Sequence, residues 1–188
     1  MGVGGASPFR IRRAVCLLRR GGLLAYPTEA VYGLGCDPLN GAAVARLLAL
    51  KERPLHKGLI LIAAEPAQLA PFIAPLDDRQ WAPALATWPG PHTWLFPAAP
   101  GLPAWINGGG PSVAVRVTAH PLAAELCRRF GGALVSTSAN LSGRPPARTP
   151  LQVRRRCPGV DAILHGATGG LARPTPIRHL LDGRLVRS

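Results

Sequence analysis

Long apolar runs are missing from this sequence. No stretch approaches the roughly 20 consecutive apolar residues that a membrane-spanning helix needs. Near the N-terminus the apolar residues are interrupted by arginine at positions 10, 12, 13, 19 and 20. A membrane span is therefore not expected, and the sequence predicts a cytoplasmic protein.

Paired cysteines and metal-binding histidine motifs are also missing. The cysteines lie far apart and form no Cys-x-x-Cys pair, which gives no support for a zinc knuckle or a thioredoxin-like redox motif. We expect reduced, mostly structural thiols at Cys16, Cys36, Cys127 and Cys157. The five histidines show no His-Glu-x-x-His spacing, so we expect them at the surface or at helix caps, and no metal site is predicted.

The common nucleotide and hydrolase signatures do not occur. The sequence has no Gly-x-x-x-x-Gly-Lys-Ser/Thr phosphate loop, no complete Gly-x-Gly-x-x-Gly fingerprint and no Gly-x-Ser-x-Gly elbow. Neither of the two common nucleotide-binding scaffolds therefore applies. Acidic residues are scarce as well, with 9 against 22 basic residues and a formal charge of +13. This imbalance predicts attraction to polyanions such as nucleotides, RNA or acidic lipid headgroups.

Lysine is nearly absent, and both lysines lie within residues 51–57, as Lys51-Glu-Arg53-Pro-Leu-His-Lys57. Lysine binds phosphate as a mobile point charge and arginine as a planar fork, so a Lys-x-Arg pair offers both modes at one place. These residues therefore indicate an anion site. The alternative is a basic helix end that faces solvent and complements the helix dipole. The residues alone leave both interpretations open.

Helix and strand signals alternate along the whole chain. We expect helices at 8–20, 40–53 and 120–130, and another starting at Thr149-Pro150. We expect strands at 22–26, 59–63, 94–96, 113–117 and 133–135, and a terminal hairpin around Asp182-Gly183. The fold class is therefore α/β, with a sheet flanked by helices. At 188 residues the chain is predicted to form a single domain, 1–188.

Two regions suit ligand binding. The turn after the first strand, within residues 22–35, is rich in glycine, hydroxyl and aromatic residues, and its glycines would let backbone amides approach an anion. The run Ser136-Thr-Ser-Ala-Asn140 follows another strand, and ligands of open α/β sheets collect at strand ends. Glycines needed only for a tight turn are the alternative. The loop 97–111 is interpreted as a surface loop, with a mobile flap as the alternative.

Several blocks in a fixed order resemble one known family. These are residues 25–37 (AYPTEAVYGLGCD), Lys51-x-Arg53-Pro54, residues 112–117 (SVAVRV), His120-Pro121 and residues 136–143 (STSANLSG). Together they resemble the YrdC/Sua5-like threonylcarbamoyl-AMP synthases, from about residue 10 to the C-terminus. The run from Lys51 to Ile62 looks most like the short bacterial TsaC-type subgroup, and the chain ends where longer relatives would add a C-terminal domain.

The resemblance implies a nucleotidyltransferase. Its substrates would be L-threonine, bicarbonate or CO2, and ATP, and its products L-threonylcarbamoyladenylate and pyrophosphate. The adenylate would pass to the tRNA threonylcarbamoyl transferase complex, which makes N6-threonylcarbamoyladenosine at position 37 of tRNAs reading codons that begin with A. The implied fold is a twisted mixed β-sheet flanked by helices (YrdC/RibB-like), with a basic concave face that holds the site.

The resemblance also assigns residues to the two substrates. Arg53, Lys57, Ser112, Ser138 and Asn140 would lie on the ATP side, and Lys51 and Arg53 would be the catalytic cations. Thr28, Ala30, Arg116 and Ser136 would lie around threonine. Two positions depart from the longer relatives: Ala30 replaces a threonine hydroxyl, and Lys57 replaces a polar amide. With no paired acidic motif, we expect Mg²⁺ to arrive on the ATP phosphates, with few protein ligands.

One alternative is a binding module and the other is a related enzyme. The same basic concave surface would also suit an RNA-binding module that grips the backbone without reading sequence, and direct RNA contact is compatible with the synthase. A related carbamoyl-adenylate-forming enzyme is the second alternative. The sequence lacks the acylphosphatase segment and the Cys-x-x-Cys zinc fingers of the hydrogenase maturation proteins that carry that chemistry, which speaks against it.

Overall fold

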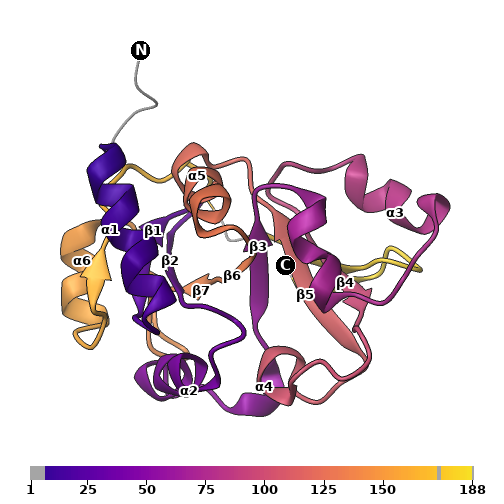
Figure 1. Cartoon of the computed structure of the whole chain (residues 1–188), viewed down its shortest axis with the longest axis horizontal. Coiled ribbons are helices and arrows are strands. Elements are labelled where there is room, and N and C mark those ends of the chain that lie inside the picture. The colour runs from indigo at the N-terminus through magenta and orange to yellow at the C-terminus, as the bar shows by residue number, and fades with distance from the viewer. Residues whose placement is uncertain (1–6, 173–174, 188) are drawn as a thin grey trace.

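The computed structural model describes residues 7–172 and 175–187. The helices are α1 (Pro8–Arg19), α2 (Gly41–Leu50), α3 (Asp78–Leu85), α4 (Ala104–Asn107), α5 (Pro121–Phe130) and α6 (Pro150–Arg156), with 3-10 turns η1 (Leu55–Lys57) and η2 (Pro66–Phe72) (Figure 1). The strands are β1 (Leu24–Pro27), β2 (Tyr32–Gly35), β3 (Ile60–Ala63), β4 (Thr93–Pro97), β5 (Ser112–Val117), β6 (Leu134–Val135), β7 (Thr137–Ser138), β8 (Ala162–Ile163), β9 (Ile177–His179) and β10 (Leu185–Arg187).

Local capping explains where the helices begin. The side chains of Ser7, Asn40 and Thr149 each accept a hydrogen bond from the backbone N–H three residues on, which confirms the predicted starts of α1, α2 and α6. His120 caps α5 in the same way, confirming one histidine as a capping residue. The sequence analysis missed α3, although Asp77 and Gln80 form a reciprocal capping box there.

The expected α/β class, with mixed strand pairing and flanking helices, is confirmed, but the strands form two mixed sheets and not the single sheet expected. A four-stranded sheet has the order β7-β2-β1-β8, and a six-stranded sheet has the order β10-β9-β4-β5-β3-β6. The chain passes from one to the other at Ser136, between β6 and β7. Ser136 N donates to Ile60 O on β3 (2.8 Å), and Ala139 N donates to Tyr32 O on β2 (2.8 Å). Local periodicity predicts a strand but does not say which strand it will pair with.

Two hydrophobic clusters hold the sheets and helices together. One packs α1 and α5 over β1, β3 and β6, through residues such as Leu18, Leu126 and Ile62. The other joins α2 to both sheets, through Leu47, Leu34 and Leu61 among others. Figure 1 shows α5 at the top of the view and α2 and α4 at the bottom, with strands between them. The four cysteines have free thiols, and three of them are buried, as expected of structural residues.

The loop 97–111 is more regular than predicted. It contains α4, whose Ile106 is fully buried, and Ile106 O accepts a hydrogen bond from Leu59 N (2.8 Å). Gly108 has φ 72°, and a Cβ there would lie 2.4 Å from the carbonyl oxygen of His56. Glycine is therefore needed where this loop meets η1. Within the described ranges, no helix combines the length and the apolar character that crossing a bilayer demands.

Candidate functional site

A cavity of about 610 Å³ is lined by residues of both sheets. This volume falls in the usual range for small-molecule sites. Every site residue predicted from the sequence lines it: Thr28, Ala30, Lys51, Arg53, Lys57, Ser112, Arg116, Ser136, Ser138 and Asn140. The structure therefore brings together all of the residues assigned to the two substrates.

Part of the cavity wall comes from alternate residues of strands β4 and β5. On β5, Val113, Val115 and Val117 point into the hydrophobic core, while Ser112 and Arg116 face the cavity, as the alternation predicts. Thr93 and Leu95 on β4 face the same cavity.

The end of α2 supplies the cationic side. Lys51 is the C-cap of α2. The chain then turns through Glu52, whose φ of 49° is a left-handed conformation that costs a non-glycine residue roughly 1 kcal/mol. This turn presents both Lys51 and Arg53 to the cavity. Strain of this kind is often retained at functional sites.

Lys51 is only 3% exposed, so the solvent-facing interpretation of this helix end is wrong for Lys51. Its Nζ donates to Ser138 O (2.5 Å), Asn140 O (2.7 Å) and Asn140 Oδ1 (3.2 Å). An ammonium has three N–H donors, so these acceptors use all of them. Burial lowers the pKa of Lys51 to about 8, and the nearby charge of Arg53 acts in the same direction. Lys51 thus holds the Ser-x-Asn loop, residues 138–140, in place.

The Ser-x-Asn loop is a connected polar network. Ser138 Oγ donates to Asn140 Oδ1 (2.6 Å), and Asn140 Nδ2 donates to the carbonyl oxygen of Arg144. The loop is also held from the other side, because Ser142 Oγ donates to Lys51 O (3.1 Å). The hydroxyl and amide groups of this loop are therefore oriented before any ligand binds.

Arg53 and Lys57 occupy the turn that follows α2. Arg53 Nε donates to Gly58 O (3.1 Å), and its Nη2 donates to Lys57 O (3.0 Å) and Gly58 O (2.8 Å). These bonds tie the guanidinium to residues 57–58 at the cavity wall. The side chain of Lys57 is exposed, so for this lysine the solvent-facing interpretation holds.

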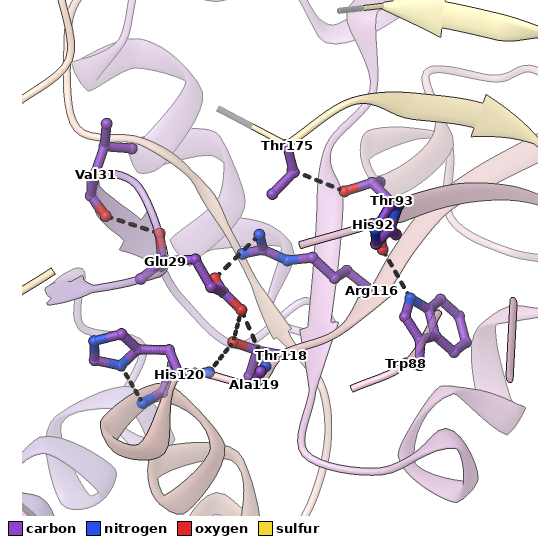
Figure 2. A network of polar contacts seen from close by, with 12 residues as sticks. Glu29, Val31, Trp88, His92, Thr93, Arg116, Thr118, Ala119, His120 and Thr175 are labelled. Atoms are coloured by element: carbon purple, nitrogen blue, oxygen red, sulfur yellow. Dashed lines mark hydrogen bonds and ion pairs between the residues drawn. The ribbon is translucent and has the colours of Figure 1, made fainter. Parts of the chain in front are cut away.

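Arg116 forms a buried ion pair with Glu29, a residue that the sequence analysis did not single out. Arg116 Nη1 lies 3.2 Å from Glu29 Oε2, and the two residues are 5% and 6% exposed. Figure 2 shows the pair, with Glu29 Oε1 also accepting from Thr118 Oγ1 (2.7 Å) and Ala119 N (3.0 Å). Burial by itself would raise the pKa of Glu29. The Arg116 charge and these hydrogen bonds outweigh burial and hold the pKa below its ordinary value.

Glu29 could have been noticed in the sequence. It is one of only nine acidic residues, and it lies between Thr28 and Ala30, both assigned to threonine. Within the described part of the chain, two buried atoms of the pair have no hydrogen-bond partner, Glu29 Oε2 and Arg116 Nε. The guanidinium of Arg116 therefore meets Glu29 as an ion pair and is not saturated by hydrogen bonds.

The sequence analysis also missed one wall of the cavity. Thr175, Ile177 and Val186 line it from the C-terminal segment. Thr93 Oγ1 on β4 lies 3.2 Å from Thr175 Oγ1. The predicted terminal hairpin is confirmed, since β9 and β10 pair antiparallel, but its parallel pairing with β4 was not foreseen. That pairing brings residues more than 80 positions apart to one cavity.

Carboxylates and histidines are absent from the lining. None of the described residues that line the cavity is Asp, Glu or His. Across residues 7–172 and 175–187, no group of three or more His, Cys, Asp or Glu side chains is arranged to hold a metal ion. The cavity thus offers cations, hydroxyls and amides, which suit binding of anionic ligands.

Comparisons with known proteins agree with the motifs. The Sua5/YciO/YrdC family model, described as "Telomere recombination", matches residues 16–188. The threonylcarbamoyl-AMP synthase of Halorhodospira halophila is 60% identical over 185 residues, covering 97% of this chain and 96% of that protein.

Solved structures give the same result. A crystal structure of P. abyssi Sua5 complexed with L-threonine matches with a TM-score of 0.88 and 31% identity, over 96% of this chain and 54% of that one. The chain thus spans about half the length of that Sua5. E. coli YciO matches with a TM-score of 0.86 and 25% identity, over 98% and 91% of the two chains.

Proposed function

The chain belongs to the Sua5/YciO/YrdC family, and we propose that it is a threonylcarbamoyl-AMP synthase. It forms L-threonylcarbamoyladenylate and pyrophosphate from L-threonine, bicarbonate or CO2, and ATP. The observation that carries this proposal is the convergence of every predicted ATP and threonine residue on one cavity. The similarity to proteins of that name supports it.

Arg116 is the centre of the threonine side. A buried guanidinium that lines the cavity suits a carboxylate, which is its strongest partner. Thr28 and Ser136 supply hydroxyls nearby, and Ala30 leaves space where longer relatives carry a hydroxyl. In this proposal the threonine carboxylate binds Arg116, which leaves the amine facing the ATP side.

Arg53, Lys57, Ser112, Ser138 and Asn140 form the ATP side. Arg53 and Lys57 offset the negative charge of the triphosphate. Lys51 acts with them through its charge and through its hold on the Ser138 and Asn140 carbonyls. Because the described lining contains no carboxylate, Mg²⁺ fits best as an ion carried by the ATP phosphates, where it would neutralise charge on the leaving pyrophosphate.

The reaction needs little acid–base machinery from the protein. The threonine amine loses a proton to solvent, and its nitrogen forms a bond to the carbon of CO2, with release of a second proton, or of bicarbonate, with loss of water, which gives a carbamate. A carbamate oxygen then attacks the α-phosphorus, and the bond to the pyrophosphate oxygen breaks. Since the described lining has no Asp, Glu or His, positioning and charge neutralisation are the contributions that this cavity can make.

The proposal also covers the setting of the enzyme. The chain would act as one domain, residues 1–188, which extends slightly beyond the described ranges. It would work in the cytoplasm and pass its product to the tRNA threonylcarbamoyl transferase complex, which completes N6-threonylcarbamoyladenosine at position 37. Direct contact with RNA through the cationic residues of the cavity is compatible with this role.

Pyrophosphate release, measured with each substrate omitted in turn, tests the function. We expect release only when L-threonine, bicarbonate and ATP are all present. Release that ignores threonine would overturn the proposal. A protein that makes no adenylate but binds RNA with an affinity that falls steeply with salt would be the alternative RNA-binding module.

A further inference from the structure

Glu29 contacts the main cation of the threonine side without lining the cavity itself. It lies in the turn between β1 and β2, while Arg116 is on β5, and the two meet at 3.2 Å. Arg116 lines the cavity, and Glu29 does not. Glu29 therefore does not touch a ligand in the cavity, and its nearest route to one is its contact with Arg116.

The backbone of Glu29 is fixed by its neighbours. Leu171 N donates to Glu29 O (3.0 Å), and Gly169 N donates to Thr28 O (3.0 Å). A Cβ on Gly169 would lie 3.0 Å from both Cα and O of Glu29, so the two segments are in close contact. The carboxylate is thus attached to a rigid frame.

The two carboxylate oxygens have different tasks. Oε1 is occupied by Thr118 Oγ1 and the amide of Ala119, and Thr118 Oγ1 itself accepts from His120 N (3.1 Å). Oε2 forms the ion pair with Arg116 Nη1 and accepts no hydrogen bond from the described residues. One oxygen anchors the side chain, and the other holds one edge of the guanidinium (Figure 2).

A carboxylate in this place has an electrostatic consequence as well. The cavity must hold a triphosphate and an amino-acid carboxylate close together, and an isolated arginine would attract the more highly charged phosphate more strongly. A negative charge 3.2 Å from Arg116 reduces that attraction most for the most highly charged anion. Discrimination by a repulsive element is a general device of specific sites.

We propose that Glu29 is a positioning and specificity-determining residue, which aims Arg116 at the threonine carboxylate and keeps phosphate groups off it. The proposal rests on the function proposed above. A base role for Glu29 has no support, because the residue does not line the cavity and its Oε1 already accepts two hydrogen bonds.

Calorimetric binding of L-threonine without ATP, at increasing inorganic phosphate, tests the proposal. Glu29→Gln keeps the shape but removes the charge. We expect the Kd for threonine to rise about tenfold, because a guanidinium that is no longer held loses alignment. We also expect phosphate to compete with threonine several-fold more strongly in this variant than in the wild type. A purely structural role would not change phosphate competition.

Glu125→Gln is the matched control. Glu125 is a partly exposed glutamate on α5 that pairs with Arg128 and Arg129, so it undergoes the same chemical change in an ion pair outside the cavity lining. Glu125→Gln should leave the Kd for threonine and the strength of phosphate competition unchanged. Glu29→Asp retains the charge and should restore resistance to phosphate, and it decides the matter if Glu29→Gln fails to fold.

The outcomes separate the two proposals. A wild-type protein that does not bind threonine would overturn the proposed function. Threonine binding by Glu29→Gln within about twofold of wild type, with no added phosphate competition, would overturn only the role of Glu29. If Glu29→Gln does not fold, Glu29→Asp decides. Phosphate that binds to Glu29→Asp as tightly as threonine does would then overturn the role of Glu29.

Discussion

Two buried cations face the same cavity, and they are held in opposite ways. Lys51 and Arg116 are 3% and 5% exposed. The ammonium of Lys51 donates to three neutral oxygens of Ser138 and Asn140. Arg116 has a carboxylate partner on one edge and a buried Nε with no hydrogen-bond partner among the described residues. All three N–H donors of Lys51 therefore bind protein oxygens, whereas the guanidinium of Arg116 keeps donors for a ligand.

The difference also appears in the ionisation of the two regions. Burial lowers the pKa of Lys51 to about 8, so the folded protein disfavours its charge. Burial would raise the pKa of Glu29, yet its partners hold it below the ordinary value, so the folded protein favours the charged carboxylate beside Arg116. The charged form of Glu29 is stable because Arg116 is its counter-ion. The charged form of Lys51 has only the dipoles of its acceptor oxygens and stays costly to bury.

Removing Lys51 should have the largest effect on activity. Lys51→Ala leaves the carbonyls of Ser138 and Asn140 without their donor, so the loop should lose its orientation toward ATP. We expect threonine-dependent pyrophosphate release to fall by about 1,000-fold or more, comparable to the loss of a preorganised electrostatic contact. Arg53→Ala should cause a similar loss. Circular dichroism should show that both variants remain folded, and full activity in both would refute the site assignment.

Changing Arg116 should separate threonine from ATP. Arg116→Ala should raise the KM for threonine by about 100-fold, because a charge-assisted bidentate contact is lost, with little change in the KM for ATP. The variant should also melt at a lower temperature, because Glu29 is left buried without its counter-ion. Arg116→Lys keeps the charge and is the control for stability. If ATP binding alone suffered, the threonine role of Arg116 would be wrong.

The titration of Lys51 measures how strongly burial disfavours its charge. Because the chain has only two lysines, isotope labelling of lysine gives only two side-chain signals in NMR spectra. We expect the Lys51 signal to titrate near pH 8. An ordinary lysine has a pKa of about 10.4, so in the unfolded chain Lys51 keeps its proton to a higher pH than in the folded protein. The contribution of Lys51 to the free energy of unfolding should therefore rise between about pH 8 and 10.4. A Lys51 midpoint near 10.4 would contradict its desolvation.

Lys57 should give the smallest effect. Its side chain is exposed at the cavity, where water and salt screen its charge. Lys57→Ala should raise the KM for ATP by only about threefold, and added salt should abolish the difference from wild type. A loss as large as that of Lys51→Ala would show that solvent does not screen the charge of Lys57 at this site.

Local patterns predicted the parts of the site that depend on neighbours in sequence. The helix caps at Ser7 and Asn40 and the alternation along β5 follow from short-range rules, and the motif order identified the cavity residues. The parallel pairing of β9 with β4 could not be predicted, because nothing in either segment names its partner. The same reason hides the Glu29–Arg116 pair, whose members are 87 positions apart.

Ser136 lies where the chain crosses between the two sheets. The strands on either side, β6 and β7, have two residues each, so few backbone hydrogen bonds oppose local opening there. A bound substrate that contacts Ser136 and both sheets would stabilise these residues against local opening. Amide hydrogen exchange over residues 134–138 should therefore slow on ligand binding, and these few amides would report occupancy of the enzyme without any catalytic assay.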